Sequence, residues 1–387
     1  MPFLNVQCIY LNLIFCSFIA NTFKIEKILL NNVHSNLSEN LSDMKRLKYL
    51  LVYLLPITVY ISFTSRGIVT LLPMILFFGV VPILEVFFKA DSYNFDKETA
   101  KLEKENKLYS WILYATVPIQ LSMLFFFFYV IQESLNTTEY IGRISAMGLM
   151  CGVLGINVGH ELGHRINKAE VFLGELMLLT SLNTHFLPYH NGGHHFNVAT
   201  PNDAATARKN ESLYIFWIRS HFSSYLNAWQ LENKRLHNEN KRAFTFQNKM
   251  VKYSVANLLV IVTIYYFFGL NVLLSFIAAA VIGILQLETV NYIEHYGLLR
   301  KKNEKGRYEK VRHHHSWNSD HIIGKLMLFN LSRHSDHHYN GSKHYQLLKS
   351  LPESPQMPTG YPGMMLLSLI PPLWFKYMNS KISKLQY

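Results

Sequence analysis

The chain has 387 residues, of which 50% are hydrophobic, 14% are aromatic and only 16% are charged. A soluble domain of this size needs far fewer apolar side chains, so the composition indicates a membrane protein. The formal net charge is +12 at pH 7. The basic residues lie in loops between apolar runs, where they set membrane orientation and meet anionic lipid headgroups, so we expect no nucleic-acid partner. Cys8, Cys16 and Cys151 form no C-x-x-C pair, which excludes an iron–sulfur or thioredoxin-like module in the chain.

Residues 1–43 differ from the rest of the chain. They contain a short apolar run, residues 8–20, without a convincing small-residue cleavage site. Met44 begins the sequence Met-Lys-Arg-Leu-Lys-Tyr-Leu, which is typical of a protein whose first helix inserts directly. We hypothesise that translation starts at Met44 and that residues 1–43 are a non-native extension or a flexible segment. Residues 44–387 would then form a single membrane domain.

Six apolar runs approach the roughly 20 residues that a helix needs to cross a bilayer. They span about 47–64, 67–89, 109–132, 138–160, 251–269 and 271–291. The loops at one set of ends are rich in lysine and arginine, which places both termini and the long basic segments in the cytoplasm. A seventh apolar stretch, 171–187, would separate the histidine clusters if it crossed fully, so we expect a re-entrant or interfacial helix there. The predicted fold is an all-α integral membrane protein with six transmembrane helices and a cytoplasmic histidine-rich helical cap.

Nine histidines fall into four clusters at or near the ends of apolar runs. The clusters are His160/His164, His190/His194/His195, His295 and His334/His337/His338. Imidazole binds iron, zinc, copper or nickel, and nine imidazoles exceed what one ion can use. A structural zinc site closes with four ligands. Two metal ions that share the histidines and keep positions open therefore fit best, and such a site suits chemistry on a small molecule such as dioxygen.

The sequence from His160 to His164 matches H-E-x-x-H, which places two imidazoles on one face of a helix. In a zinc protease Glu161 would be the general base. A protease needs only one or two further ligands, however, and would leave seven clustered histidines unexplained. We therefore expect both histidines to bind metal and Glu161 to lie close to it.

The remaining clusters also suit metal binding. Two glycines loosen the 190–195 segment, and the 334–338 cluster has helical spacing, with Asp336 as a candidate acceptor that would orient an imidazole. Glu288, Asn291 and His295 fall on one face at the end of an apolar helix, where polar groups are costly unless they are used.

Several segments resemble the membrane alkane monooxygenase family, within the histidine-box desaturase and hydroxylase superfamily. The resemblance covers residues 45–380 in order, and its motifs are 160–165, 190–203, 291–298, 315–319, 333–338 and 371–374. It implies an inner-membrane enzyme with two non-haem iron ions bound by the nine histidines. The implied reaction is O2-dependent hydroxylation of a terminal C–H bond in an n-alkane or similar chain. Electrons would come from rubredoxin and an NAD(P)H-dependent rubredoxin reductase.

Around the nine ligands we expect a set of neighbouring groups that support them, namely Glu161, Asp203, Glu288, Glu294, Asp336 and His315. Tyr189 and Asn202 stand where the family usually has acidic residues. An apolar tunnel for the substrate is expected from the 67–89 and 109–132 spans. Segment 207–250 is basic and aromatic, so it could lie on the membrane or dock an acidic electron carrier. A fatty acyl desaturase or hydroxylase, and more distantly a membrane zinc protease, are the alternative functions.

Overall fold

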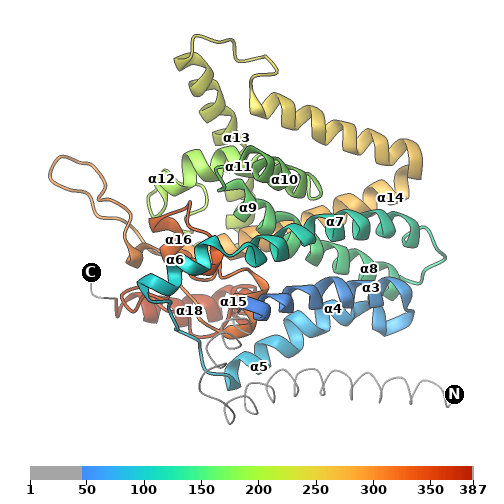
Figure 1. The fold of residues 1–387 in the computed structure, drawn as a ribbon, viewed down its shortest axis with the longest axis horizontal. Helices are drawn as coiled ribbons and strands as arrows, with labels where there is room; N and C mark the ends of the chain where they lie inside the picture. Colours follow the sequence, from blue (N-terminus) through green and yellow to red (C-terminus); the bar gives the residue numbers. More distant parts are fainter. Residues whose placement is uncertain (1–45, 386–387) are drawn as a thin grey trace. The chain divides into compact units, whose positions relative to one another are not determined.

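Figure 1 shows the computed structural model, which describes residues 46–385. One compact unit begins at Tyr49. Within the described residues the regular structure is helical, apart from two isolated β-bridges. The expectation that residues 1–43 are a non-native extension, with a start at Met44, lies outside the described part of the chain.

Helices cover all six predicted apolar runs. Four are long and apolar enough to cross a membrane, and Lys48–Thr64 is a shorter apolar helix. The elements are η2 (Lys48–Tyr53) with α3 (Leu54–Thr64); η3 (Gly67–Leu71), α4 (Leu72–Met74), η4 (Ile75–Val80) and α5 (Val81–Phe87); α7 (Lys107–Val130); α8 (Thr137–Met150), η5 (Cys151–Ile156) and α9 (Asn157–Gly163); and α14 (Lys249–His295).

Helix α14 contains two of the predicted runs. Gly269 interrupts it with φ 83° and ψ 177°, a conformation that only glycine adopts readily, and the two arms fold back from this point (Figure 1). The sequence placed a boundary between spans at the same position. The break therefore separates the 251–269 run from the 271–291 run.

Three turns meet at one end of these helices. Arg66, between α3 and η3, forms an ion pair of 2.8 Å with Glu133, which lies between α7 and α8. Phe268, beside the α14 break, packs on Phe128 with ring centroids 5.1 Å apart. The histidine-bearing ends, at His160 in α9 and His295 in α14, are the opposite ends of their helices.

The 171–187 stretch forms a helix too short to cross a bilayer. Helix α10 (Lys168–Leu179) runs back along α9, with Gly159 and Gly174 so close that a Cβ on Gly174 would lie 2.9 Å from the Gly159 carbonyl oxygen. The chain reaches the level of Cys151, whose carbonyl accepts a hydrogen bond of 3.1 Å from Ser181. It then returns to His190, as expected for a re-entrant segment.

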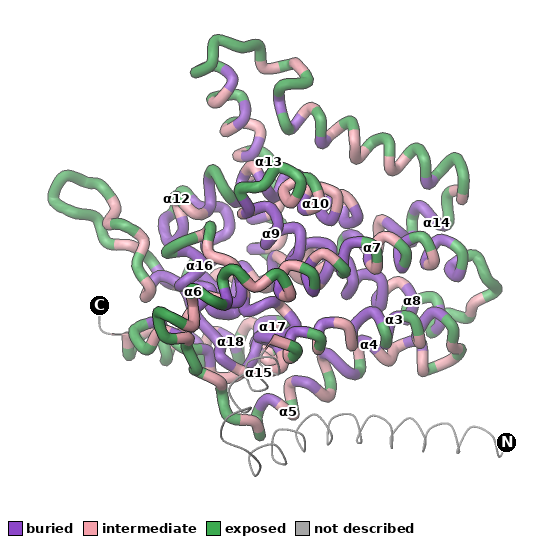
Figure 2. The backbone as a smooth tube through the Cα atoms, viewed as in Figure 1, coloured by how far each residue is buried: buried purple, intermediate pink, exposed green. Residues whose placement is uncertain are grey.

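The remaining helices surround the histidine-bearing ends. They are α6 (Lys97–Glu105), α11 (Phe186–Tyr189), η6 (His190–His194), α12 (His195–Asn197), α13 (Leu213–Asn238), η7 (His313–His315), α15 (Ile322–Met327), α16 (His334–Tyr339), η8 (Tyr345–Leu347), α17 (Tyr361–Ser368) and α18 (Pro371–Ile382). Trp317 and Trp374 are buried in one hydrophobic cluster of this region. Figure 2 shows that burial is densest around α9 and α16, whereas the far end of α13 and the first arm of α14 are largely exposed.

We predict that Gly269→Ala destabilises the protein by about 1–3 kcal/mol, because a Cβ strains this backbone conformation. No atom lies within 4 Å of the added Cβ, so the effect comes from the backbone alone. Thermal unfolding in detergent measures it. Gly79→Ala is the matched control, since its Cβ meets only the Ile75 side chain at 4.0 Å. Equal unfolding midpoints for the two variants would contradict the assignment of strain to Gly269.

Candidate metal centre

Five histidines converge on one point. They are His160 and His164 from α9 and its end, His190 and His195 from η6 and α12, and His337 from α16. Their Nε2 atoms approach closely, for example 2.8 Å from His160 to His190, 3.1 Å from His160 to His337 and 3.0 Å from His195 to His190. Three segments distant in the sequence thus contribute imidazoles to one group.

These approaches indicate a metal site rather than a hydrogen-bond network. A neutral imidazole carries a single N–H, so it cannot bond through one Nε2 atom to several other Nε2 atoms at once. Ligands at right angles around an ion with bonds of ~2.1 Å lie ~3.0 Å apart, whereas tetrahedral ligands lie ~3.4 Å apart. The 2.8–3.2 Å separations within this group match the right-angled arrangement. The five imidazoles would therefore hold a metal ion together.

The other four histidines form a second group. His194, His295, His334 and His338 place one ring nitrogen each within 4.8 Å of the others, and all four side chains are buried. The His334 Nε2 atom lies 3.1 Å from that of His295 and 2.9 Å from that of His338. The Nε2 atom of His194 is buried without a hydrogen-bond partner. Such an orphaned nitrogen among three other imidazoles fits a metal ligand.

Two pairs of adjacent residues divide between the groups. His195 and His337 belong to the five-histidine group, while His194 and His338 belong to the four-histidine group. Consecutive helical residues point about 100° apart, so one short helix between two ions can serve both. The two groups are neighbours, since the rings of His195 and His338 are 4.6 Å apart.

Burial favours the uncharged form of five of the clustered histidines. Desolvation, followed by repulsion from neighbouring histidines, lowers the pKa of His190, His195, His334, His337 and His338 well below the ordinary value. Neutral imidazole has the free lone pair that a metal needs.

Asp203 supports one ligand directly. Its Oδ2 atom lies 2.9 Å from His194 Nδ1 and accepts a hydrogen bond of 2.6 Å from Thr206. Tyr189, which replaces the acidic residue usual in the family, donates to the other carboxylate oxygen. Burial alone would raise the pKa of Asp203, but His194 and the three hydrogen bonds outweigh it and lower the pKa to about 2. The carboxylate is therefore ionised and directs His194 Nε2 toward the four-histidine group.

Glu294 lies beside a second ligand. Its Oε1 atom is 3.2 Å from His334 Nδ1 and accepts a hydrogen bond of 2.6 Å from Tyr361. The sequence suggested Glu294 but held no signal for Tyr361, because the contact joins residues 67 positions apart.

The other expected neighbours lie differently. Glu161 forms a salt bridge of 2.8 Å with Arg165 and accepts a hydrogen bond of 3.2 Å from the Tyr345 backbone N–H. The carboxylate that a protease would use as a general base is therefore bound to an arginine. Asp336 binds the Lys343 side chain and the Lys349 backbone instead of an imidazole.

His315 and Glu288 also lie beyond hydrogen-bonding reach of the ligand rings. His315 Nε2 lies 3.4 Å from Glu309, and only its backbone contacts His295. Glu288 accepts from Asn291 at 3.3 Å and lines a polar cavity beside His194.

The 315–319 motif positions α16. Asn318 accepts a hydrogen bond from the Ser335 backbone at 2.8 Å and donates to its side chain at 2.7 Å. Arg333 binds Asp320 at 3.0 Å and the Leu348 carbonyl at 2.7 Å. These contacts fix the helix that carries three ligands, a role that the sequence motif alone did not reveal.

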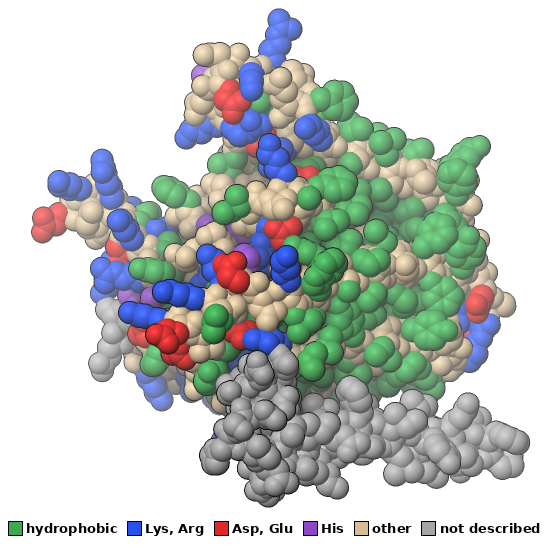
Figure 3. Space-filling model, viewed as in Figure 1, with side chains coloured by type: hydrophobic (Ala, Val, Ile, Leu, Met, Phe, Trp, Pro, Cys, Tyr) green, Lys and Arg blue, Asp and Glu red, His purple; other side chains and the backbone are tan. Residues whose placement is uncertain are grey.

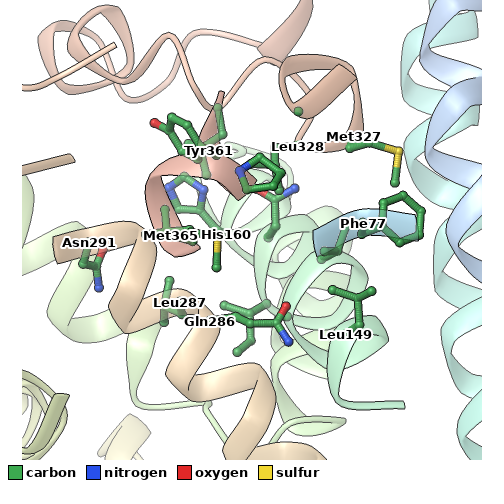
Figure 4. A pocket seen from close by; sticks show the side chains of 18 of the residues that line it. Phe77, Leu149, His160, Gln286, Leu287, Asn291, Met327, Leu328, Tyr361 and Met365 are labelled. Carbon is green, nitrogen blue, oxygen red and sulfur yellow. The ribbon is translucent and has the colours of Figure 1, made fainter. Parts of the chain in front are cut away.

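An apolar cavity ends at both histidine groups (Figure 4). Its space between atoms, including the part open to solvent, is about 940 Å³, and its walls come mainly from η4, η5, the second arm of α14, segment 324–331 with α15, and α17. His160, His190 and His334 form part of its lining. The expected contribution of the 67–89 span is present through Phe77, but the 109–132 span lines no part of this cavity. That expectation was wrong because η5, rather than α7, supplies the wall that faces the second arm of α14 at the cavity.

These features define a histidine-rich membrane protein with an apolar cavity beside two candidate metal sites. Residues 140–367 match the family model described as fatty acid desaturase. The alkane 1-monooxygenase of Ectopseudomonas oleovorans is 37% identical over 347 residues, or 88% of this chain and 86% of that protein. Alkane 1-monooxygenase 1 of Pseudomonas aeruginosa is 38% identical over 79% of this chain and 81% of its own length.

The chain belongs to the alkane 1-monooxygenase family, within the histidine-box superfamily, as the motifs predicted. It is therefore a monooxygenase. A more distant relative, the xylene/toluene monooxygenase hydroxylase component of Pseudomonas putida, is 28% identical over 61% of this chain and 63% of that protein.

We predict that Asp203→Asn weakens metal binding at the four-histidine group by about 10–100-fold. Tyr189, Thr206 and His194 all donate to the carboxylate, and an amide offers only one acceptor oxygen to replace two. Metal content after graded chelator treatment measures the loss. Asp336→Asn is the control and should keep both metals, because Asp336 binds lysines. Equal metal retention by the two variants would refute the role of Asp203.

Proposed function

We propose that the chain hydroxylates n-alkanes or similar hydrocarbon chains at a terminal carbon, using two iron ions held by the nine histidines. The observation that carries the proposal is the apolar cavity whose end is lined by ligands from both groups, His160 and His190 from one and His334 from the other. The alkane 1-monooxygenases at 35–38% identity support this substrate class.

An unactivated hydrocarbon offers no charge or hydrogen bond, so only shape can position it. The walls at Leu55, Phe77, Leu149 and Met365 would hold the chain by dispersion and exclude water, leaving its terminal carbon at the histidine end. Two bound iron ions would supply the activation of O2 that C–H hydroxylation requires. Asp203 would keep the His194 ring fixed during turnover.

The proposed topology has six crossings, with the histidine groups on the cytoplasmic side of the inner membrane. Helix α14 would cross twice, once with each arm, and the other three long helices would cross once each. The shorter Lys48–Thr64 helix would provide the sixth crossing. The three turns near Arg66, Glu133 and Phe268 lie at one end of the helices, which supports an even number of crossings. The basic loops lie at the other end, with the histidines.

Electrons would come from rubredoxin, reduced by its NAD(P)H-dependent reductase. We expect docking at the basic hairpin, defined as residues 300–312, which carries seven lysines and arginines and only two glutamates. It projects from the unit in Figure 1, and its cationic side chains cluster in Figure 3. Arg300 anchors its base to the Phe196 carbonyl at 2.8 Å, one residue after the ligand His195. The basic hairpin begins five residues after His295, whereas most of the basic 207–250 segment lies farther along the chain from any clustered histidine.

We predict that the iron-loaded protein, supplied with rubredoxin, its reductase, NAD(P)H and octane or hexadecane, forms the 1-alkanol with one oxygen atom from O2. Metal analysis should find two irons and little zinc. His338→Ala should abolish product because the four-histidine group loses a ligand. His313→Ala, a histidine paired with Glu353 outside both groups, is the matched control and should retain activity. A new double bond in an acyl chain would instead identify a desaturase, and zinc-dependent peptide cleavage would identify a protease.

We predict that reversing Lys302, Lys305 and Arg307 to glutamate raises the KM for rubredoxin about tenfold at low ionic strength, with little change in kcat. Exposed charges steer encounter and are screened by salt, so the difference from the wild type should shrink at high ionic strength. Steady-state reduction at several salt concentrations measures this. Charge reversal at Lys234 and Lys241 near the end of α13 is the comparison, and an effect confined to those residues would move the docking site to α13.

A further inference from the structure

A second cavity beside the metal groups is polar. It has about 290 Å³ of space between atoms and lies between η6, the second arm of α14 and α13. Asn183, Tyr189, Ser220 and Glu288 contribute polar groups to its lining. We call this cavity the polar chamber. It is much smaller than the apolar cavity and is suited to water rather than to a hydrocarbon chain.

Several buried polar atoms at the polar chamber have no hydrogen-bond partner within the protein. They include both side-chain polar atoms of Asn183 and the hydroxyl of Ser220, and each of these two residues is only 1% exposed. A buried polar atom without a partner costs about 1–3 kcal/mol. Ordered water is the usual partner in such a place. The chamber therefore has unmet hydrogen-bonding capacity that an ordered water molecule would satisfy.

The two cavities share a wall. Phe186, His190, Leu287 and Asn291 line both of them. Asn291 also donates a hydrogen bond of 3.3 Å to Glu288, which lines only the polar chamber. Figure 4 shows Asn291 and Leu287 on the same helix at the edge of the apolar cavity. A polar path thus reaches the wall of the substrate cavity at Asn291, close to the metal ligand His190.

Hydroxylation needs protons as well as electrons. One hydrocarbon, one O2, two electrons from the carrier and two protons give one alkanol and one water. The lining of the apolar cavity includes one carboxyl group, Glu294, but its Oε1 atom already accepts a hydrogen bond from Tyr361 and lies beside His334. We propose that the polar chamber holds water that supplies these protons, and that Glu288 is the side chain that takes up and releases them. This proposal rests on the proposed hydroxylation.

Glu288 has the required position. Its side chain is buried, with 3% relative exposure, and it faces the chamber together with His194. A carboxyl group can accept a proton from chamber water and return it to another water at the wall, where Asn291 holds the carboxyl group in place. The product water can leave along the same path. Glu288 acts through water, so it is a positioning and relay residue rather than a metal ligand.

The test compares Glu288→Gln with the wild type in the reconstituted hydroxylation assay. The amide keeps the shape of the side chain but cannot exchange a proton, so kcat should fall at least about tenfold, while the KM for octane and the iron content stay unchanged. The solvent deuterium isotope effect on kcat should increase. Glu288→Asp, which keeps the carboxyl group, should recover part of the rate. Ser220→Val should also lower kcat, because it replaces a polar group in the chamber lining with an apolar one and leaves the carboxyl group present.

Glu103→Gln is the control, because Glu103 is a buried carboxyl of α6 that accepts from Tyr109 and lies outside both cavities. It should leave kcat and the isotope effect unchanged. If Glu288→Gln and Ser220→Val both keep the wild-type kcat and isotope effect, protons arrive elsewhere, for example past the partly exposed His164 and His195, and the proposal is wrong. A wild-type protein that binds iron but forms no alkanol would instead overturn the proposed function.

Discussion

The convergence of nine neutral imidazoles at the ends of the apolar helices is the constraint on which the rest of the structure depends. Buried polar rings are costly unless they are satisfied, and the separations near 3 Å between their Nε2 atoms cannot all be hydrogen bonds. Two metal ions, as proposed, would satisfy them together. The supporting features then share one role, because each brings a ring from a distant segment to one of two points and holds it there.

Two structural features place the histidine rings: pairs of adjacent histidines and hydrogen-bonding carboxylates. Adjacent histidines, His194 with His195 and His337 with His338, divide between the groups, so one turn of chain serves both. Carboxylates then orient individual rings, as Asp203 does for His194. The replacement of the usual acid by Tyr189 fits this scheme, because the tyrosine hydroxyl binds Asp203 and so supports the ligand indirectly.

The sequence predicted the features that depend on local pattern. Apolar runs gave the helices, Gly269 fell between two predicted runs, and the histidine spacing gave all nine rings that the structure brings together. Contacts between distant residues were much harder to predict. Tyr361 donates a hydrogen bond to Glu294, and Asn318 donates one to Ser335. No local sequence pattern around Tyr361 or Asn318 predicts these partners. Asp336 had helical spacing suitable for an imidazole, but a lysine only seven residues away competes successfully for its carboxylate.

The apolar and polar cavities correspond to two opposing requirements of the proposed reaction. A hydrocarbon is held best where water is absent, whereas the reduction of O2 consumes protons that only polar groups can deliver. In the proposed reaction, a single wall between the two environments would keep the substrate dry while polar groups approach the histidines from the other side. His190 lines both cavities and belongs to the five-histidine group, so the two environments meet at a clustered histidine. Glu288 lies just behind that wall and on the same helix as His295, where a carboxyl group would relay protons without entering the apolar cavity.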